Sequence, residues 1–339
     1  MYETLHCHTT TSDGQLTHLQ VLDACARNNI SIVAFTDHDA VPNQKIVDQL
    51  QANKDHPTKW IIGCELSSGW PKEIGGVGSS FHIVGLFVDP FNKALLERNR
   101  KFQESRVERM ERMVKNLKGL GFEVSVDDCL KESGGESIGR PHIVAALKKI
   151  EPNLKIIEEL KNKMAEDAEN DSELKEKYEK MIERGEEQYP YVLFLDSAAY
   201  IPNIYVDYLY YTDLDETVRL IRGAGGVAIL AHWSFSKSKV GEKVIEGLFK
   251  ESRLDGAEIV FGLGVTWRGG GEMKEDMGTM KRLTEKWNKL QSGGADIHKE
   301  EDFRYFVEAK WYAEKTVGLT ERMIKQGNLD PQFSSLRCL

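Results

Sequence analysis

Short apolar runs alternate with segments of helical periodicity over the first ninety residues. Continuous or alternating apolar runs of this length indicate strands, and apolar spacings of three and four indicate helices. Residues 16–28 have the helical pattern, with Thr17 as a suitable N-cap. The expected strands are residues 2–8, 31–35, 60–64 and 81–88. This alternation is typical of a βα barrel or an open parallel sheet, in which chemistry gathers at the carboxyl ends of the strands.

The pattern changes after Pro90. Residues 94–118 and 153–188 are rich in lysine and glutamate and poor in glycine, which indicates long charged helices. Between these segments, Pro141 is placed to start a further helix. The middle of the chain therefore differs in character from its beginning.

Strand-like runs return at residues 226–231 and 255–260. The sequence therefore predicts one α/β domain formed by residues 1–93 and 195–339, interrupted by a mainly helical insertion of residues 94–194 that flanks the active site. A chain of 339 residues with 40% hydrophobic content can bury the core that such a domain needs.

The sequence predicts a cytoplasmic protein without a membrane partner. No apolar run approaches the roughly 18 residues of a membrane span. The first residues, Met1 to His6, lack the basic start and the apolar stretch of a signal peptide. The five cysteines are scattered, form no C-x-x-C pair and are odd in number, so reduced thiols are expected.

The formal net charge is −9, which predicts no global attraction to the backbone of a nucleic acid. A pocket that holds several divalent cations would invert the field locally and attract anions. This combination favours a small phosphorylated substrate over duplex DNA.

Metal-ligating residue types gather at the predicted strand ends, beginning with His6 and His8. On a strand, the period of two places these imidazoles on one face, as a chelating pair requires, although a solvated strand end is the alternative. Asp13 follows in a Ser-Asp-Gly turn, for which an ordinary Asx turn is the alternative. These motifs are weak when each is taken alone.

The Thr-Asp-His-Asp segment at residues 36–39 is a stronger signal, because three ionisable groups directly after a buried strand repel or desolvate one another without cations. For Asp37 and Asp39, we expect orientation of ligands rather than direct ligation. Taken singly, the other candidates have structural alternatives, namely a loop carboxylate, a core histidine or a helix cap. These candidates are Glu65, His82, His142, His232, Asp296 and His298. Their joint placement predicts a multi-metal site.

The pattern H-x-H-T-x-x-S-D-G followed by F-T-D-H-D, with later R-P-H, A-H and D-x-H elements, resembles the polymerase and histidinol phosphatase (PHP) family of metal-dependent phosphoesterases. The resemblance covers residues 1–90, 139–145, 226–260 and 293–298. It implies an α/β fold of the distorted (β/α)7 barrel type with an inserted helical subdomain. It also implies two or three divalent ions, for which manganese, zinc and iron are all suitable.

The resemblance also implies roles for individual residues. The first ion would be held by His6, His8, Glu65 and Asp296, the second by Glu65, His82 and His142, and the third by Asp13, His38 and His298. Arg140 and His232 match positions that face the phosphate, and His232 is the expected proton donor. The chain departs from the family pattern at Trp233, where proline is usual, and at Ala295, where serine is usual.

The implied activity is hydrolysis of a phosphomonoester or phosphodiester of a nucleotide by a hydroxide that bridges two ions. The expected substrates are a nucleoside 5′-phosphate, a 3′,5′-bisphosphate nucleotide or a short 5′-phosphorylated RNA. One alternative is a phosphatase of the histidinol-phosphate type, which often has histidine where Asp13 stands and typically lacks the insertion. A second alternative is a metal-binding structural module without catalysis.

Overall fold

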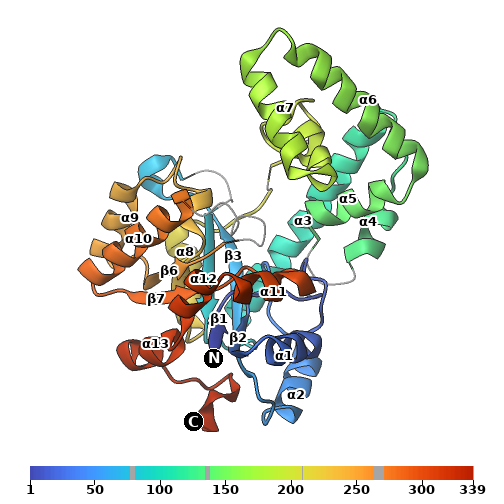
Figure 1. Cartoon of the computed structure of the whole chain (residues 1–339). Coiled ribbons are helices and arrows are strands. Elements are labelled where there is room, and N and C mark those ends of the chain that lie inside the picture. The colour runs from blue at the N-terminus through green and yellow to red at the C-terminus, as the bar shows by residue number, and fades with distance from the viewer. Residues whose placement is uncertain (77–80, 134–137, 208, 263–270, 339) are drawn as a thin grey trace. The chain divides into compact units, whose positions relative to one another are not determined.

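The computed structural model of the chain describes residues 1–76, 81–133, 138–207, 209–262 and 271–338 (Figure 1). These residues form two compact units. The first consists mainly of Met1–Phe102 and Tyr210–Leu339, and the second of Gln103–Gly134 and Ile138–Leu209.

The unit boundaries fall later in the chain than the predicted positions 93 and 195. The start of helix α3 (Lys93–Gly119) belongs to the first unit, because Leu95 lies in its core and Arg98 is buried beside Asp39. Residues 195–209 belong to the second unit, since Leu195 lies in its core.

Seven strands form one sheet in the first unit, and their spatial order follows the sequence. They are β1 (Tyr2–Thr4), β2 (Ile30–Phe35), β3 (Lys59–Ser68), β4 (Phe81–Leu86), β5 (Val227–Leu230), β6 (Gly256–Val260) and β7 (Leu290–Gly293). All neighbours pair in parallel, except that β4 is antiparallel to both β3 and β5. The α/β class and a mostly parallel sheet are confirmed, whereas a wholly parallel sheet does not form.

The reversal of β4 decides where His82 lies. In a parallel strand, a residue near the start would lie at the edge opposite the carboxyl ends. Because β4 is antiparallel, His82 pairs in register with Ser67, close to the end of β3. His82 therefore shares an edge of the sheet with residues that follow the parallel strands.

Backbone hydrogen bonds join the segments that follow the first and last strands. The amide of Leu5 donates to the carbonyl of Gly293 at 2.9 Å, and the amide of His8 donates to the carbonyl of Ile297 at 2.8 Å. Strand β1 ends at Thr4, so the predicted strand over residues 2–8 is too long. The alternation of side-chain directions continues through His6 and His8, because the segment after β7 pairs with this part of the chain and holds it extended.

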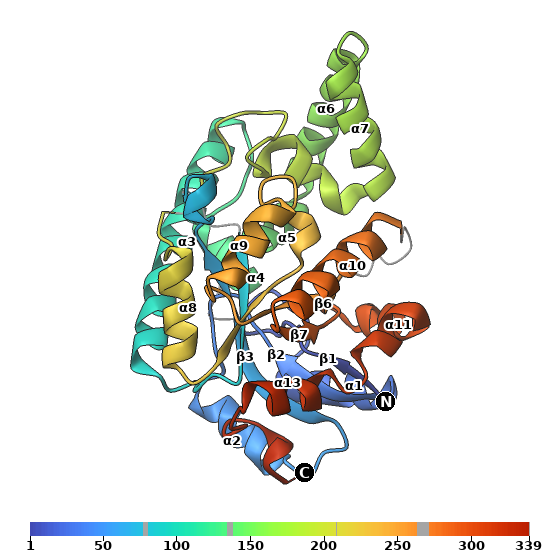
Figure 2. The same ribbon diagram turned by 90° about the vertical axis from the view of Figure 1, so that its left-hand side faces the viewer.

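Helices surround the sheet of the first unit (Figure 2). The α-helices are α1 (His18–Arg27), α2 (Gln44–Ala52), α8 (Leu214–Gly223), α9 (Glu242–Lys250), α10 (Gly271–Lys286), α11 (Glu300–Glu308), α12 (Lys310–Ala313) and α13 (Leu319–Gly327). Short 3₁₀ turns are η1 (Lys72–Ile74), η4 (Trp233–Phe235), η6 (Glu314–Thr316) and η7 (Ser335–Cys338). Thr17 caps α1 as predicted, because its side chain accepts from the amide of Gln20.

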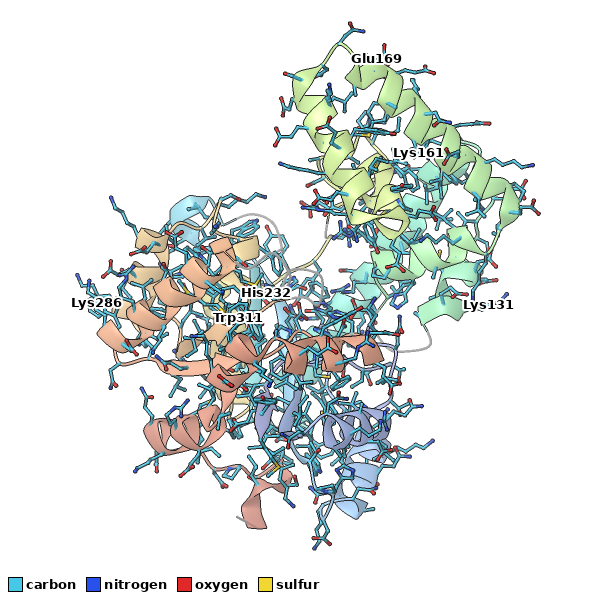
Figure 3. All side chains as sticks on the ribbon, in the orientation of Figure 1. Lys131, Lys161, Glu169, His232, Lys286 and Trp311 are labelled. Carbon is cyan, nitrogen blue, oxygen red and sulfur yellow. The ribbon has the colours of Figure 1, made fainter. Side chains whose placement is uncertain are left out.

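The second unit is helical. Besides the greater part of α3, it contains α4 (Val126–Ser133), α5 (Arg140–Lys148), α6 (Glu151–Ala168), α7 (Ser172–Arg184), the short turn η2 (Glu186–Gln188) and the π-helical turn η3 (Tyr191–Leu195). The pattern over residues 153–188 is divided into two helices, because Asp171 accepts hydrogen bonds from the amides of Glu173 and Leu174 and so starts α7. Charged side chains cover α6 and α7, as the helical pattern predicts (Figure 3).

In the part of the chain that the structure describes, no helix combines the length and the apolar character needed to cross a lipid bilayer. Four cysteines whose side chains are described (Cys7, Cys25, Cys64 and Cys129) are buried and form no disulfide.

Candidate metal centre

Residues from six strands or the segments that follow them meet at one edge of the sheet. His6 and His8 follow β1, His38 follows β2, His232 follows β5, and Asp296 and His298 follow β7. Glu65 lies within β3 rather than at its end, because that strand continues to Ser68. His82 joins them from the start of the reversed strand β4.

Among the described residues, the candidate ligand atoms form three groups, each with all its atoms within 4.8 Å of one another. The groups are His6, His8, Glu65 and Asp296; His8, Asp13, His38 and His298; and His38, Glu65 and His82. Each pair of groups has one residue in common, namely His8, Glu65 or His38. Three groups linked in this way form a continuous cluster that can hold more than one cation.

His8 has one ring nitrogen toward each of two groups. Its Nε2 lies 3.1 Å from Oδ1 of Asp296 and 3.3 Å from Oε2 of Glu65. Its Nδ1 lies 3.6 Å from Oδ1 of Asp13. Because a neutral imidazole ligates through one nitrogen, His8 fits the group of Asp296 better, and its other nitrogen faces the group of Asp13.

Glu65 is the most heavily shared carboxylate of the cluster and is fully buried. Its Oε1 lies 2.8 Å from Nδ1 of His82 and 2.8 Å from Nε2 of His232. Its Oε2 lies 3.1 Å from Nδ1 of His38 and 3.3 Å from Nε2 of His6. Because Glu65 belongs to two of the three groups, its carboxylate is available to a cation in either of them.

The residues present fit divalent cations. Buried polar atoms in proteins nearly always have hydrogen-bond partners. Yet Nδ1 of His38, Nδ1 of His82 and Oε2 of Glu65 are buried, and, although charged groups lie close, none of them has a partner with hydrogen-bond geometry within the described residues. Mixed imidazole and carboxylate donors of this kind suit zinc, manganese and iron.

The charges of the cluster depend on one another. Burial alone would raise the pKa of Glu65, but His38, His82 and His6 lie close and hold that pKa well below its usual value. Burial opposes protonation of His8, but the neighbouring carboxylates of Asp296 and Glu65 outweigh it and raise the pKa of His8 to about 10. For His38, burial prevails over the nearby carboxylates and lowers the pKa to about 4.

Glu258 of β6 supports the cluster without belonging to any of the three groups. Its carboxylate accepts from Nδ1 of His6 at 2.8 Å and from the backbone amide of His232 at 2.7 Å. The sequence interpretation gave Glu258 no role. A carboxylate inside the otherwise apolar strand Gly256–Val260 is a signal that could have identified it.

Asp37 and Asp39 also lie outside the three groups. Asp37 accepts from the amide and hydroxyl of Thr9 and from the hydroxyl of Ser12, which shapes the loop before Asp13. Asp39 accepts from the amide and hydroxyl of Ser67 and pairs with the buried Arg98.

Two residues of the site have backbone angles that are unusual for their type. The φ angle is 26° at His232 and 48° at Asp296. Positive φ at a residue other than glycine costs on the order of 1–3 kcal/mol and is concentrated at functional sites. Both residues lie in the segments that follow β5 and β7, where the candidate site is formed.

The two departures from the family pattern fit the local packing. Trp233 is buried, and its indole nitrogen donates to the carbonyl of Val240 at 2.7 Å. Ala295 is fully buried, and its amide donates to the hydroxyl of Thr4. Neither substitution removes a ligand atom from the cluster.

Arg140 and His142 lie in the second unit, at the start of α5. Nδ1 of His142 accepts from the amide of Gly139 at 2.9 Å and so caps the helix. Arg140 donates to the carbonyl of Leu195 and lies 3.5 Å from Asp196. The role of His142 as a metal ligand and the role of Arg140 in binding the phosphate remain predictions.

Comparisons with known proteins place this site in a family. A family model described as PHP domain matches residues 4–232. The chain is 25% identical over 295 residues to a 3′,5′-nucleoside bisphosphate phosphatase of Chromobacterium violaceum, covering 87% of this chain and 86% of that protein. It is 23% identical over 301 residues to a 5′-3′ exoribonuclease of Haemophilus influenzae, covering 87% of this chain and 89% of that protein.

Two solved structures share the fold. One is a Bifidobacterium adolescentis protein assigned as a metal-dependent phosphoesterase, with a TM-score of 0.66, 19% identity and 96% of each chain covered. The other is an amidohydrolase of Chromobacterium violaceum with bound sulfate and no metal, with a TM-score of 0.61, 22% identity and 88% of each chain covered. Since the family model spans more than half of the sequence, the chain belongs to the PHP domain family, as its histidine and aspartate motifs predict.

Proposed function

We propose that the chain hydrolyses a phosphate ester of a nucleotide, with a 3′,5′-bisphosphate nucleotide or the 5′-phosphorylated end of a short RNA as substrate. The observation that carries this proposal is the cluster of three ligand groups joined through His8, Glu65 and His38. Family membership makes the chain a metal-dependent phosphoesterase, and the likeness to a nucleotide phosphatase and an exoribonuclease supports a nucleotide substrate.

The ligand residues would be distributed over three ions. The first ion is assigned to His6, His8, Glu65 and Asp296, and the third to Asp13, His38 and His298. The second is assigned to Glu65 and His82, with His142 as the further ligand that the family resemblance implies. Divalent cations in such a site activate water as the nucleophile and offset the charge of the phosphate oxygens.

The remaining functional residues would act on the substrate directly. Arg140 would bind the non-bridging oxygens of the phosphate, which is mainly electrostatic stabilisation and positioning. His232 would donate a proton to the leaving oxygen. The location of His232 beside Oε1 of Glu65 supports this role, because it places the imidazole against the carboxylate that two groups share.

We also infer that the sheet closes as the distorted (β/α)7 barrel of the family. The hydrogen bonds from Leu5 to Gly293 and from His8 to Ile297 support this closure, because they connect the first and last strand segments. Closure through these segments would hold His8 and Asp296 at their 3.1 Å separation.

The histidinol-phosphate type of activity is the second candidate. Asp13 stands where that branch often has histidine, and the helical insertion is present, so both features favour a nucleotide substrate. The relatives named above are matched over more than four fifths of their own length, which agrees with a shared architecture. A metal-binding module without catalysis is disfavoured by the family and by the complete ligand groups.

A phosphate-release panel with added Mn²⁺ tests the proposal. The substrates are AMP, adenosine 3′,5′-bisphosphate, a 5′-phosphorylated oligonucleotide and histidinol phosphate. We expect phosphate release from adenosine 3′,5′-bisphosphate or from the 5′-phosphorylated oligonucleotide. Asp13→Ala should abolish this release. Asp23→Ala, whose side chain is exposed on α1, should retain it. Release from histidinol phosphate alone would support the second candidate, and no release from protein that binds Mn²⁺ would support the structural module.

A further inference from the structure

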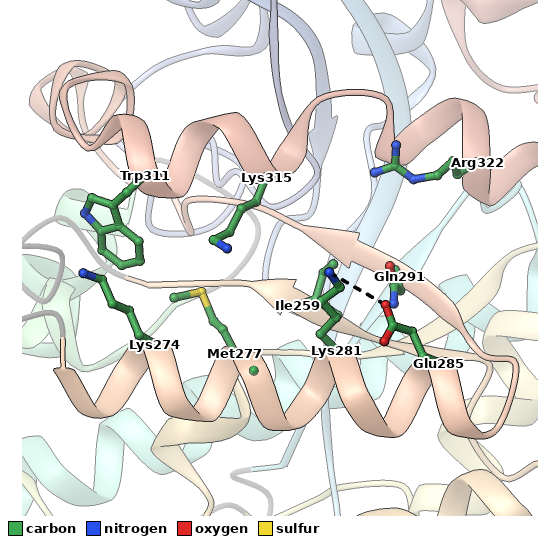
Figure 4. A pocket seen from close by; sticks show the side chains of 10 residues that line it. Ile259, Lys274, Met277, Lys281, Glu285, Gln291, Trp311, Lys315 and Arg322 are labelled. Atoms are coloured by element: carbon green, nitrogen blue, oxygen red, sulfur yellow. Dashed lines mark ion pairs between the residues drawn. The ribbon is translucent and has the colours of Figure 1, made fainter.

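A groove of about 580 Å³ lies on the outside of the first unit, between α10 and the segment from α12 to α13 (Figure 4). Lys274, Lys281 and Glu285 project into it from α10, and Trp311, Lys315 and Arg322 project from the opposite wall. Pockets that bind small molecules have volumes of about 300–1,000 Å³. The groove is therefore large enough for a ligand of nucleotide size.

The sheet separates this groove from the metal centre. Successive side chains of a strand point to opposite faces. In β6, Glu258 points to the metal centre, where it contacts His6, whereas the next residue, Ile259, forms part of the floor of the groove. A ligand in the groove would thus bind apart from the substrate.

The groove is cationic in an acidic chain. Its lining includes four lysine or arginine side chains and one glutamate, although the whole chain carries a net charge of −9. Lys281 pairs with Glu285 at 3.8 Å. Among the described residues, Lys274, Lys315 and Arg322 make no ion pair with a carboxylate; Lys274 lies 4.3 Å from the ring centre of Trp311, and Arg322 donates to the carbonyl of Val317. Three cations that have no ion pair with a carboxylate in the described part of the chain favour an anionic ligand.

The spacing of the cations favours an extended anion over a single phosphate. Lys274 and Lys281 are seven residues apart on α10, which places them on one face about 10 Å apart along the helix axis. Gly278 lies between them and has no side chain to fill the groove. A Cβ added at Gly278 would meet no atom within 4 Å, so the space above it is open. Trp311 supplies a flat apolar wall at one end, which suits a base or ribose.

We propose that this groove binds a nucleotide with two or more phosphate groups, as a second ligand site outside the metal centre. The phosphates lie between Lys274, Lys315 and Arg322, and the apolar part of the ligand lies against Trp311. This site is independent of the proposed hydrolysis, because no ligand of the metal centre lines it.

Isothermal titration of the metal-free protein with ADP at low salt tests the charge of the groove. We expect binding that weakens as salt is raised, and at least tenfold weaker binding in Lys315→Glu and in Arg322→Glu. Lys325→Glu is the matched control, because Lys325 is an exposed lysine of α13 that does not line the groove. Equal affinity of the Lys315 and Lys325 variants for ADP would overturn the proposal, as would no binding of ADP by the wild type at millimolar concentration.

A second pair of variants tests the shape of the groove without a change of charge. Gly278→Leu fills the space between the lysines and should weaken ADP binding at least tenfold. Gly247→Leu makes the same change within α9, where an added Cβ likewise meets no atom within 4 Å, and should leave binding unchanged. Unchanged binding in Gly278→Leu would overturn the proposal, and inorganic phosphate that binds as tightly as ADP would overturn the assignment to a nucleotide.

Discussion

Glu258 of β6 accepts a hydrogen bond from Nδ1 of His6 at 2.8 Å, and both side chains are buried. A proton held on Nδ1 leaves the lone pair of Nε2 directed toward Glu65 and Asp296, which lie 3.3 Å and 3.4 Å from it. The second oxygen of Glu258 accepts from the backbone amide of His232. One carboxylate thus orients a proposed metal ligand and positions the proposed proton donor.

Glu258→Gln is expected to weaken metal binding. The amide of glutamine has one oxygen that can accept and an NH2 group that cannot, so the two oxygen acceptors that serve His6 and His232 cannot both be replaced. Loss of such a supporting partner typically costs 10–100-fold in affinity. Competition between the protein and a chelator for Mn²⁺ measures the change. Glu251→Gln, at an exposed residue after α9, is the control. If Glu258→Gln bound Mn²⁺ as tightly as the wild type, the hydrogen bond from His6 to Glu258 would not contribute to metal binding.

Glu65 and His298 should differ in how many ions their loss removes. Glu65 belongs to two of the three ligand groups, whereas His298 belongs to one. We therefore expect Glu65→Gln to lose more bound metal per chain than His298→Asn. Metal content by mass spectrometry after dialysis against Mn²⁺ gives the comparison. Equal losses in the two variants would contradict the assignment of Glu65 as a shared ligand.

Metal binding should release protons. Burial opposes the charge of His8, but Asp296 and Glu65 outweigh it, so the pKa of His8 in the metal-free protein is about 10. At pH 7.5 this imidazole carries a proton that it must lose to ligate a cation, so the apparent affinity rises with pH up to that value. Titrations with Mn²⁺ in buffers of different ionisation enthalpy count the protons. Heats that do not depend on the buffer would contradict this prediction.

The sequence predicts those parts of the site that depend on local order. His38 and His232 come shortly after buried strands that the apolar runs predict, so the strand pattern alone places them at the same edge. The reversal of β4 has no such local signal, because it depends on how β4 pairs with β3 and β5. The contact between His6 and Glu258 joins residues 252 positions apart, and a lone carboxylate in a strand does not specify its partner.

Asp39→Asn is expected to destabilise the first unit, because it leaves the guanidinium of Arg98 buried without a compensating charge. Arg98 and Asp39 are 2% and 0% exposed, and breaking a buried pair from one side costs about 3–5 kcal/mol. Urea unfolding of the metal-free protein measures the loss. Glu300→Gln is the control, because it breaks an exposed pair with Arg27 and should cost no more than about 1 kcal/mol. If Asp39→Asn and Glu300→Gln lowered the free energy of unfolding by similar amounts, Arg98 would have found another partner or water.

His232→Asn should separate substrates by their leaving groups. If His232 donates a proton to the leaving oxygen, kcat falls by about 10²–10⁴-fold for a nucleotide ester, whose alkoxide needs that proton. For p-nitrophenyl phosphate the loss should be much smaller, because nitrophenolate leaves without protonation. Metal content must be measured in parallel, since Nε2 of His232 lies 2.8 Å from Oε1 of Glu65 and the substitution can disturb that ligand. Equal losses for both substrates at full metal content would remove the proton-donor role, and equal losses with reduced metal content would assign His232 to holding Glu65 in place.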